Sequence, residues 1–284
     1  MDKGILHIYR NVPYGRETLL SSIYFAKMLD IELFIYIPQF QKFNMYFEHE
    51  VVQVTLDDSY LNELDRAKER IDGVLKQEDY EATYLKIKEF SASSLPDLPT
   101  DFSFMTCPRV IKGLLNKIYP GQIGPIVRKI LLNARFPVYL PCLIFKPWKS
   151  IIVMFGGSKT SVKAASLGLK IAKRSGIPLY FFTQNEKQDY KSYKEILKSN
   201  EETKNIFSYI QHWYFFDQGD FKENLFNIPH DSLIVAGLFG HGLIKGLAFG
   251  GKLELMQSIL PNNFLLVGPN FDEQATFFRN LRNG

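Results

Sequence analysis

The sequence predicts an α/β protein with two tandem domains, and three observations support this fold class. The chain has 284 residues, which suits one large domain or two of ordinary size. Residues 5–36 and 151–182 align without a gap at an offset of 146 positions, so the chain contains an internal repeat. Each copy holds a short apolar run, a turn, an amphipathic stretch and a second apolar run, which is the pattern of a β-α-β unit in a parallel sheet.

The second half shows the predicted elements most clearly. Apolar residues at helical spacing predict helices over 162–174 and 252–260, and the polar stretch 187–210 and the segment 221–226 are also expected to be helical. Short runs rich in aliphatic and aromatic residues predict strands over 150–155, 178–183, 212–217, 232–236 and 264–267. Strands and helices therefore alternate, as in a parallel sheet whose crossover connections are helices.

The first half follows the same plan less regularly. Residues 101–107 correspond to 231–237 at an offset of 130, and residues 137–141 correspond to the last strand at an offset of 126. The segment 60–76 has a charged and an apolar face, so we expect a helix that covers the sheet. A proline-broken loop at 91–101 stands where the second half has its short helix. We therefore place one domain at residues 1–146 and a second at 147–284, with the join at 145–150.

Composition and charge exclude several classes of protein. The formal net charge is +4, and Lys and Arg are interleaved with Asp and Glu, so we expect no nucleic-acid partner. No export signal or membrane-spanning run is visible, so we expect a cytoplasmic protein without a membrane partner. Cys107 and Cys142 are expected to be reduced, buried thiols, and the alternative is a redox pair at the ends of neighbouring strands.

The segment 237–251 holds six glycines between a predicted strand and a predicted helix, which raises the question of phosphate binding. A P-loop is excluded because Leu253 stands where that motif needs Ser or Thr for magnesium. A dinucleotide fingerprint is excluded because the segment follows the fourth strand of its half rather than the first. The remaining pattern is the spacing of Gly237, Gly240 and Gly250, with two and nine residues between them.

This spacing resembles the nucleotide loop of the universal stress protein family, G-x2-G-x9-G followed by Ser or Thr. Residues 151–182, with a small turn at Gly157 and Ser158, look like the family's opening strand–helix–strand, and residues 218–237 look like its Gly-Asp, short helix and fourth strand. The resemblance implies a tandem universal stress protein. Each domain would be an open five-stranded parallel sheet with helices on both faces, the adenine nucleotide alpha hydrolase-like arrangement.

The resemblance also implies an adenine nucleotide, ATP with magnesium, at the carboxyl ends of the second domain's strands. Glycine backbone amides and the N-terminus of the following helix suit an anion there. The nucleotide-binding residues that the resemblance implies are Met154, Phe155, Gly156, Gly157, Gln184, Ala236, Gly237, Gly240, His241, Gly250, Gly251 and Lys252. His241 has a second interpretation as a solvent-facing histidine, and Lys252 has one as an ordinary solvated lysine.

Two positions of the second half depart from the family pattern. Gly251 replaces the Ser or Thr, and Gly156 replaces the acidic residue that nucleotide-binding members carry after the first strand. The first half has lost more, because Cys107 and Val110 occupy the positions of the first two loop glycines, and only Gly124 matches the third. We therefore expect the first domain to bind no nucleotide and to act as a pseudo-symmetric packing partner.

Three functions follow from these observations. The first is a stress-response regulatory protein that binds an adenine nucleotide in its C-terminal domain, with at most slow ATP hydrolysis because no catalytic residue stands out. The second is a nucleotide-free universal stress protein that acts as a scaffold for protein partners. The third is an adenylyl- or phosphoryl-transfer enzyme, which would need a magnesium-binding acidic residue that the loop lacks. We favour the first, with the second as the alternative.

We expect no metal-ligating cluster, and the chain would be a pseudo-dimeric monomer or a homodimer.

Overall fold

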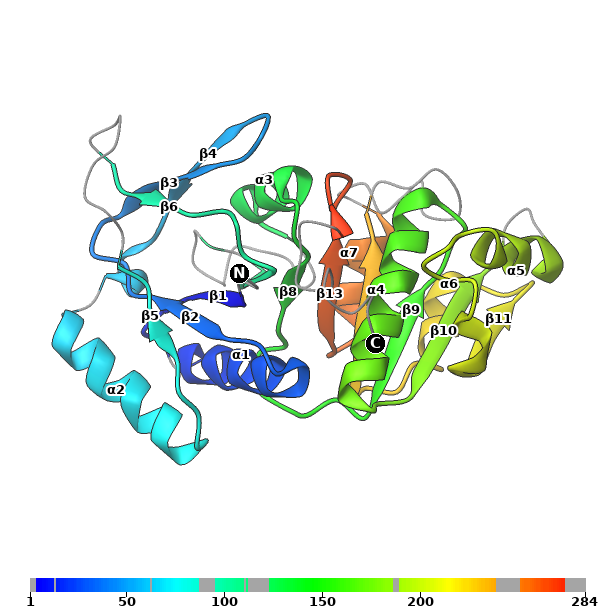
Figure 1. Ribbon diagram of the computed structural model, residues 1–284, viewed down its shortest axis with the longest axis horizontal. Helices are drawn as coiled ribbons and strands as arrows, with labels where there is room; N and C mark the ends of the chain where they lie inside the picture. The colour runs from blue at the N-terminus through cyan, green and yellow to red at the C-terminus, as the bar shows by residue number, and fades with distance from the viewer. Residues whose placement is uncertain are drawn as a thin grey trace. The chain divides into compact units, whose positions relative to one another are not determined.

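The computed structural model describes residues 4–12, 14–61, 63–86, 95–109, 111, 123–185, 189–238 and 251–273. These residues form two compact units. The first holds the described residues up to Lys146 except Ile123, together with Asp272 and Glu273, and the second holds Ile123 and Pro147–Phe271. Both units combine parallel strands with helices, so the predicted α/β class is confirmed (Figure 1).

The second unit contains parallel strands in the order β11-β10-β9-β12-β13. The strands are β9 (Ser150–Met154), β10 (Leu179–Gln184), β11 (Ile210–Phe216), β12 (Ser232–Gly237) and β13 (Asn263–Val267). The helices are α4 (Lys159–Ser175), α5 (Tyr190–Lys198), α6 (Phe221–Leu225) and α7 (Lys252–Ile259), with a 3-10 turn, η3 (Ile206–Ser208). Helix α4 lies in front of the strands and α7 behind them (Figure 1).

Local sequence explains most of these elements. Every residue of β9 and β12 is buried, as expected for strands covered by helices on both faces. Helix α4 begins after Ser158, whose side chain accepts a hydrogen bond from the Ser161 amide, and ends before Gly176, which has a φ of 71°. The helix predicted over 187–210 was too long, because α5 ends at Lys198 and is followed by turns, η3 and the start of β11.

The first unit contains parallel strands in the order β8-β7-β1-β2-β5. These are β1 (Ile5–Ile8), β2 (Leu33–Tyr36), β5 (Thr83–Tyr84), β7 (Phe104–Thr106) and β8 (Val138–Leu140). The helices are α1 (Gly15–Leu29), α2 (Leu64–Gln77) and α3 (Pro125–Asn133), with a 3-10 turn, η1 (Asp58–Tyr60), before α2. Helix α2 therefore begins at Leu64 rather than at residue 60, because residues 58–60 form the separate turn.

A small three-stranded sheet in the first unit was not predicted. Strands β3 (Lys42–Tyr46) and β4 (Val51–Thr55) form an antiparallel hairpin, and β6 (Asp97–Leu98) pairs with β3. In β4, Val52 and Val54 are buried whereas Val51 and Gln53 are exposed, the period-two pattern of a half-buried strand. Strand β6 lies inside the segment predicted to be only a loop, of which residues 91–94 lie outside the described residues.

The core of the first unit contains a buried polar chain. His7, in β1, is 2% exposed, and its Nδ1 lies 2.9 Å from Oγ of Ser22 in α1. Ser22 Oγ in turn lies 2.9 Å from Oγ1 of Thr106 in β7. Among the described residues, no group makes a hydrogen bond to Nε2 of His7. Burial without a charged partner lowers the pKa of His7 from 6.5 to about 4, so the ring is neutral in the folded protein.

We predict that His7 makes stability depend on pH. The unfolded chain binds a proton at this histidine below pH 6.5 and the folded protein does so only below about pH 4, so stability is lost as pH falls through this window. The pKa difference corresponds to a loss of about 3 kcal/mol. His7→Asn keeps a polar group near Ser22 without this titration. Urea unfolding at pH 7 and pH 4 should therefore show a smaller loss in the variant, and an equal loss in both proteins would contradict the assignment.

Candidate functional site

The candidate site lies at the carboxyl edge of the second unit's strands. Strands β9 and β12 are parallel neighbours, and Ala236 pairs with Met154 where the two strands end. The residues predicted from the end of β9 and the end of β12 therefore lie side by side, although they are far apart in the sequence. Helix α7 connects β12 to its parallel neighbour β13, so α7 begins at this same edge (Figure 1).

The side chains of Met154 and Phe155 belong to the core. Met154 is 4% exposed and Phe155 is 1% exposed. The Phe155 ring lies 5.7 Å from the ring of Phe181 and 6.0 Å from the rings of both Tyr193 and Trp213. Aromatic packing at these separations is stabilising and holds the ring among hydrophobic neighbours. The two residues can therefore serve the edge through their backbone, while their side chains support the sheet.

Gly157 has a local structural reason to be glycine. Its φ is 74°, a left-handed backbone conformation that side chains disfavour. A Cβ atom at this position would lie 3.2 Å from Cδ1 of Ile196 and 3.3 Å from Cε1 of Tyr193, both in α5. The turn between β9 and α4 is therefore packed closely against α5. Gly156, just before it, is buried and does not have a positive φ.

Gly237 is required by the contact between β12 and α4. A Cβ atom at this position would lie 2.3 Å from the carbonyl oxygen of Thr160 and 2.7 Å from the amide nitrogen of Ser161. These are backbone atoms of the first turn of α4, so a small side-chain movement cannot relieve the clash. The first glycine of the predicted loop therefore has a packing role whether or not a nucleotide binds.

The structure places Gln184 at the edge but engages its amide elsewhere. Oε1 of Gln184 accepts a hydrogen bond of 2.7 Å from the side chain of Asn224, in α6. Nε2 donates a bond of 3.3 Å to the carbonyl of Gly219, which has a φ of 91°. The Gln184 amide, which was predicted to face adenine, therefore makes its hydrogen bonds to α6 and to the turn before it.

The remaining predicted residues are only partly described. Gly240, His241 and Gly250 lie outside the described residues. Gly251 is the residue before α7 and has no side chain with which to cap that helix. The ammonium group of Lys252 lies 5.3 Å from the ring centroid of Phe221, at the start of α6, which is the geometry of a cation–π contact.

The corresponding edge position of the first unit holds an arginine that the sequence analysis did not identify. Arg10 follows β1 and occupies the repeat position of Gly156. Its guanidinium donates to Asp57 at 2.7 Å and to Ser59 at 2.6 Å, and lies 4.9 Å from the ring centroid of Tyr60. The repeat offset itself was the signal that could have found it. In the first unit, side chains therefore occupy the position at which the second unit has Gly156, which has no side chain.

The cysteines show no sign of thiol chemistry. Cys107 is fully buried at the end of β7, and its amide donates to the carbonyl of Tyr139. Burial raises the pKa of the Cys107 thiol to about 12 and also raises the pKa of Cys142, whose Sγ donates to the Ile144 carbonyl at 2.8 Å. Neither cysteine forms a disulfide, and both thiols are protonated at neutral pH, which is the state expected for inert structural thiols. Val110, the other predicted loss in this half, lies outside the described residues.

Two searches of the described residues concern other classes of site. Within these residues, no group of three or more His, Cys, Asp or Glu side chains is placed to hold a metal ion. Along the same part of the chain, no helix is both long and apolar enough to span a membrane.

Comparison with known proteins assigns the fold. No protein-family model matches the sequence, and no curated protein sequence matches it significantly. Among solved structures, a universal stress protein from Archaeoglobus fulgidus has a TM-score of 0.60 at 13% identity, over 94% of this chain and 99% of that chain. A candidate universal stress protein from Pseudomonas aeruginosa has a TM-score of 0.55 at 13% identity, over 95% of this chain and 94% of that chain.

A third solved structure has a different biological setting. The cytoplasmic domain of a prokaryotic cation chloride cotransporter has a TM-score of 0.50 at 11% identity, over 97% of this chain and 99% of that chain. Identities this low support a statement about fold and nothing finer. The chain therefore has the fold of universal stress proteins, as its sequence motifs predicted.

We predict that Gly237→Ala destabilises the second unit by about 1–3 kcal/mol, the usual cost of overpacking, because the added methyl group meets immovable backbone. The matched control is Gly73→Ala, in the middle of α2, where a Cβ atom meets nothing within 4 Å. That change should be stabilising by about 0.5–1 kcal/mol, because alanine favours a helix over glycine. Denaturant unfolding measures both. Equal effects of the two substitutions would contradict the packing role of Gly237.

Proposed function

We propose that this chain is a stress-response regulatory protein composed of two tandem universal stress protein domains, residues 1–146 and 147–284. We further propose that the second domain binds an adenine nucleotide, ATP with magnesium. The observation that carries the proposal is the edge at which β9 and β12 end side by side and at which α7 begins beside Gly251: β12 ends in Gly237, and Gly156 and Gly157 follow β9 after Phe155. The cytoplasm is the compartment that we assign.

The described residues fit a nucleotide that is held by backbone groups through its phosphates. Helices α4, α5 and α6 of the same unit are preceded by Ser158, Asp189 and Asp220, whose side chains accept hydrogen bonds from the first-turn amides. Helix α7 is preceded by Gly251 instead, which has no side chain to accept such a bond. A helix N-terminus carries partial positive charge and donors, which suits a phosphate group. Gly237, Gly240, Gly250, Gly251 and Lys252 are the residues that we assign to the phosphates.

The nucleoside would be held mainly by shape. Gly156 offers no carboxylate, and the Gln184 amide is already bonded to Asn224 and Gly219. The backbone of residues 154–157 and of Ala236 then forms the adenine side of the site. We assign no catalytic base to any residue, so ATP hydrolysis is at most slow. A switch that binds and releases nucleotide is the activity that this arrangement favours.

A nucleotide-free scaffold is the second candidate, and the engaged Gln184 amide is the observation that favours it. An edge whose polar side chains bond to one another, and whose apolar side chains are in the core, is complete without a ligand. In this alternative, the protein acts through partner proteins, as a pseudo-dimeric monomer or a homodimer. The fold similarity to the cytoplasmic domain of a cotransporter is compatible with either candidate.

The two candidates differ in nucleotide content, which can be measured directly. The full chain is purified, denatured, and its released small molecules are separated by chromatography, for the native sequence and for Gly240→Val. Valine at this position disfavours a positive φ and adds bulk to the predicted cradle. We expect near-stoichiometric adenine nucleotide from the native protein and at least about tenfold less from the variant, since losing about 1.4 kcal/mol of binding has that effect.

Gly73→Val is the matched control for that experiment. It makes the same substitution in α2 of the first unit, where no atom lies within 4 Å of the new Cβ. This variant should retain the native nucleotide content. Equal loss of nucleotide from both variants would overturn the assignment of Gly240 to the site. If the native protein carries no nucleotide and ignores added ATP, the scaffold candidate replaces the nucleotide switch.

We also predict that Gly156→Asp strengthens nucleotide binding. Of the described glycines, only Gly157, Gly176 and Gly219 have a positive φ, so the φ of Gly156 does not disfavour a side chain. An aspartate here restores the carboxylate that nucleotide-binding members of the family carry, and one hydrogen bond contributes about 1 kcal/mol, or roughly fivefold in affinity. Calorimetric titration with ATP measures the change. Affinity that is unchanged or lower in a folded variant would show that adenosine does not approach this position.

A further inference from the structure

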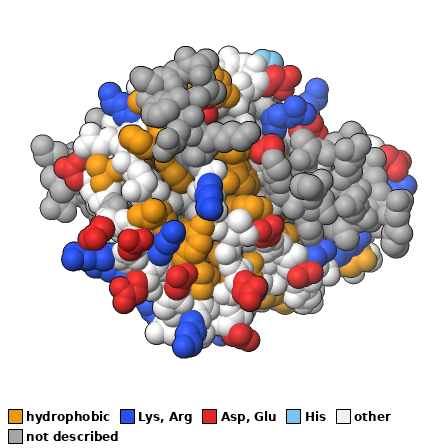
Figure 2. Space-filling view, turned by 60° about the vertical axis from the view of Figure 1, so that its left-hand side comes forward, with side chains coloured by type: hydrophobic (Ala, Val, Ile, Leu, Met, Phe, Trp, Pro, Cys, Tyr) orange, Lys and Arg blue, Asp and Glu red, His pale blue; other side chains and the backbone are white. Residues whose placement is uncertain are grey.

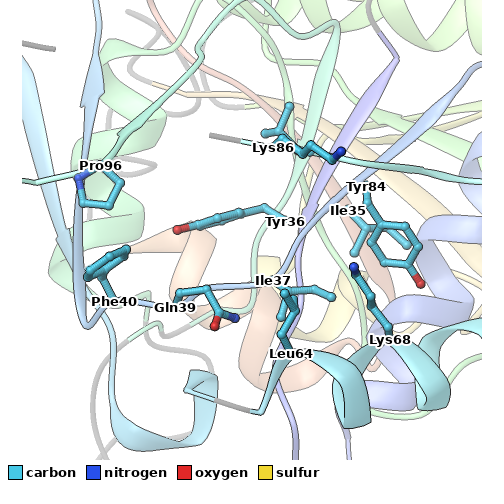
Figure 3. A pocket seen from close by; sticks show the side chains of 11 residues that line it. Ile35, Tyr36, Ile37, Gln39, Phe40, Leu64, Lys68, Tyr84, Lys86 and Pro96 are labelled. Carbon is cyan, nitrogen blue, oxygen red and sulfur yellow. The ribbon is translucent and has the colours of Figure 1, made fainter. Parts of the chain in front are cut away.

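The first unit contains a cavity of about 380 Å³ at the carboxyl ends of β2 and β5, beside α2. Figure 3 shows its lining side chains, which come from segments that are far apart in the sequence. They are Ile35, Tyr36, Ile37, Gln39, Phe40, Leu64, Lys68, Tyr84, Leu85, Lys86 and Pro96. The volume lies in the range of small-molecule sites in proteins. No motif predicted this cavity, because its residues share no spacing along the chain.

The wall of the cavity is apolar and its mouth reaches the surface. Ile35 and Ile37 are buried, and the buried ring of Tyr36 packs 5.7 Å from the ring of Phe43. At the mouth, Phe40 is 45% exposed and Leu64 is 37% exposed. On the side of the molecule that Figure 2 brings forward, hydrophobic side chains reach the surface among charged ones. Binding of an apolar ligand in an open apolar cavity of this kind is favourable, because the ligand displaces water from apolar surface.

The charged residues of the lining are both basic. Lys68 and Lys86 contribute two ammonium groups, and the described part of the lining contains no Asp or Glu. Neither lysine makes an ion pair with a described residue. The Lys68 ammonium lies 5.8 Å from the centroid of the Tyr84 ring, and the Tyr84 hydroxyl donates to Asp72 at 2.5 Å. Asp72 keeps its negative charge when it accepts this bond, but it forms no ion pair with Lys68, so the ammonium groups of both lysines can pair with a ligand.

The lining also offers a neutral hydrogen-bond donor. In Figure 3 the Tyr36 side chain points toward Pro96 and Phe40, away from Lys68 and Lys86. Burial raises the pKa of Tyr36 to about 12, so its hydroxyl keeps its proton at neutral pH. No described residue makes a hydrogen bond with this hydroxyl. An apolar wall, a phenol donor and two ammonium groups therefore surround one space.

We propose that this cavity is a binding site for a small organic anion, a molecule with a flat apolar body and one sulfonate, carboxylate or phosphate group. The apolar body lies against Ile35, Ile37 and Tyr36, and the anionic group faces Lys68 and Lys86. The two lysines select an anion over a neutral molecule of the same shape, because each is free to pair with a negative charge. This site is independent of the nucleotide site proposed for the second unit.

Two fluorescent dyes with the same aromatic skeleton test the proposal. Anilinonaphthalene sulfonate carries a negative charge, and N-phenylnaphthylamine is neutral. We expect the full-length native protein to bind the anionic dye at least about threefold more tightly than the neutral dye at low salt, with the preference falling as salt screens the lysines. Equal affinities for the two dyes would overturn the assignment of the lysines.

Two pairs of variants locate the dye. Lys68→Met should weaken the anionic dye about three- to tenfold and leave the neutral dye unchanged, whereas Lys76→Met, an exposed lysine of the same helix, should change neither. Leu64→Glu places a negative charge at the mouth and should repel only the anionic dye. Leu132→Glu, in α3 of the same unit and 36% exposed, is its control. Each variant's unfolding midpoint confirms that it is folded.

Competition with ATP separates this site from the nucleotide site. Saturating ATP should leave the anionic dye bound, because the two ligands occupy different units. Displacement of all the dye by ATP, or loss of dye affinity in Lys76→Met and Leu132→Glu as large as in their partners, would overturn the proposal. Neither result depends on whether the purified protein carries nucleotide, so failure here leaves the proposed function unaffected.

Discussion

The contact between Gly237 and the first turn of α4 is the constraint on which the candidate site depends. Strand β12 approaches α4 so closely that a single methyl group at Gly237 would overlap the Thr160 carbonyl. This contact ties the end of β12 to the start of the helix that follows β9. Because β9 and β12 are parallel neighbours, their carboxyl ends, the Ser158 cap and the start of α7 are brought to one edge. Among the described residues, this edge therefore offers a ligand backbone groups and helix termini.

The two units share one strand order but differ in the residues at the carboxyl edge of their sheets. Where the second unit has Gly156, the first has Arg10, held by Asp57 and Ser59 and stacked on Tyr60. The guanidinium is hydrogen-bonded to protein groups, so its donors and charge are already engaged and do not attract the phosphates of a nucleotide. The first unit instead opens a cavity farther along its sheet, beside Lys68 and Tyr84. On this account, the repeat has kept its scaffold and diverged at its ligand positions.

Sequence patterns predicted the second unit well because its strands are covered on both faces. Continuous apolar runs such as β9 and β12, joined by a capped amphipathic helix, leave little ambiguity. The β3–β4 hairpin was missed because its pattern is short and half-polar. Alignment could place Gln184 at the edge, but its hydrogen bond to Asn224 depends on a turn between other elements. The Arg10 cluster lay within reach of the repeat offset, whereas the cavity, assembled from unrelated segments, did not.

The asymmetry between the units is the central claim, and the stoichiometry of nucleotide binding tests it most directly. The purified full-length chain, stripped of bound ligands, is titrated with ATP and magnesium in a calorimeter. The account predicts one site per chain, because Arg10 closes the edge of the first unit and Gly156 leaves that of the second open. Two equivalent sites would contradict the assignment of the Arg10 cluster as a closed edge. No detectable binding would contradict the nucleotide switch itself and leave the chain as a scaffold.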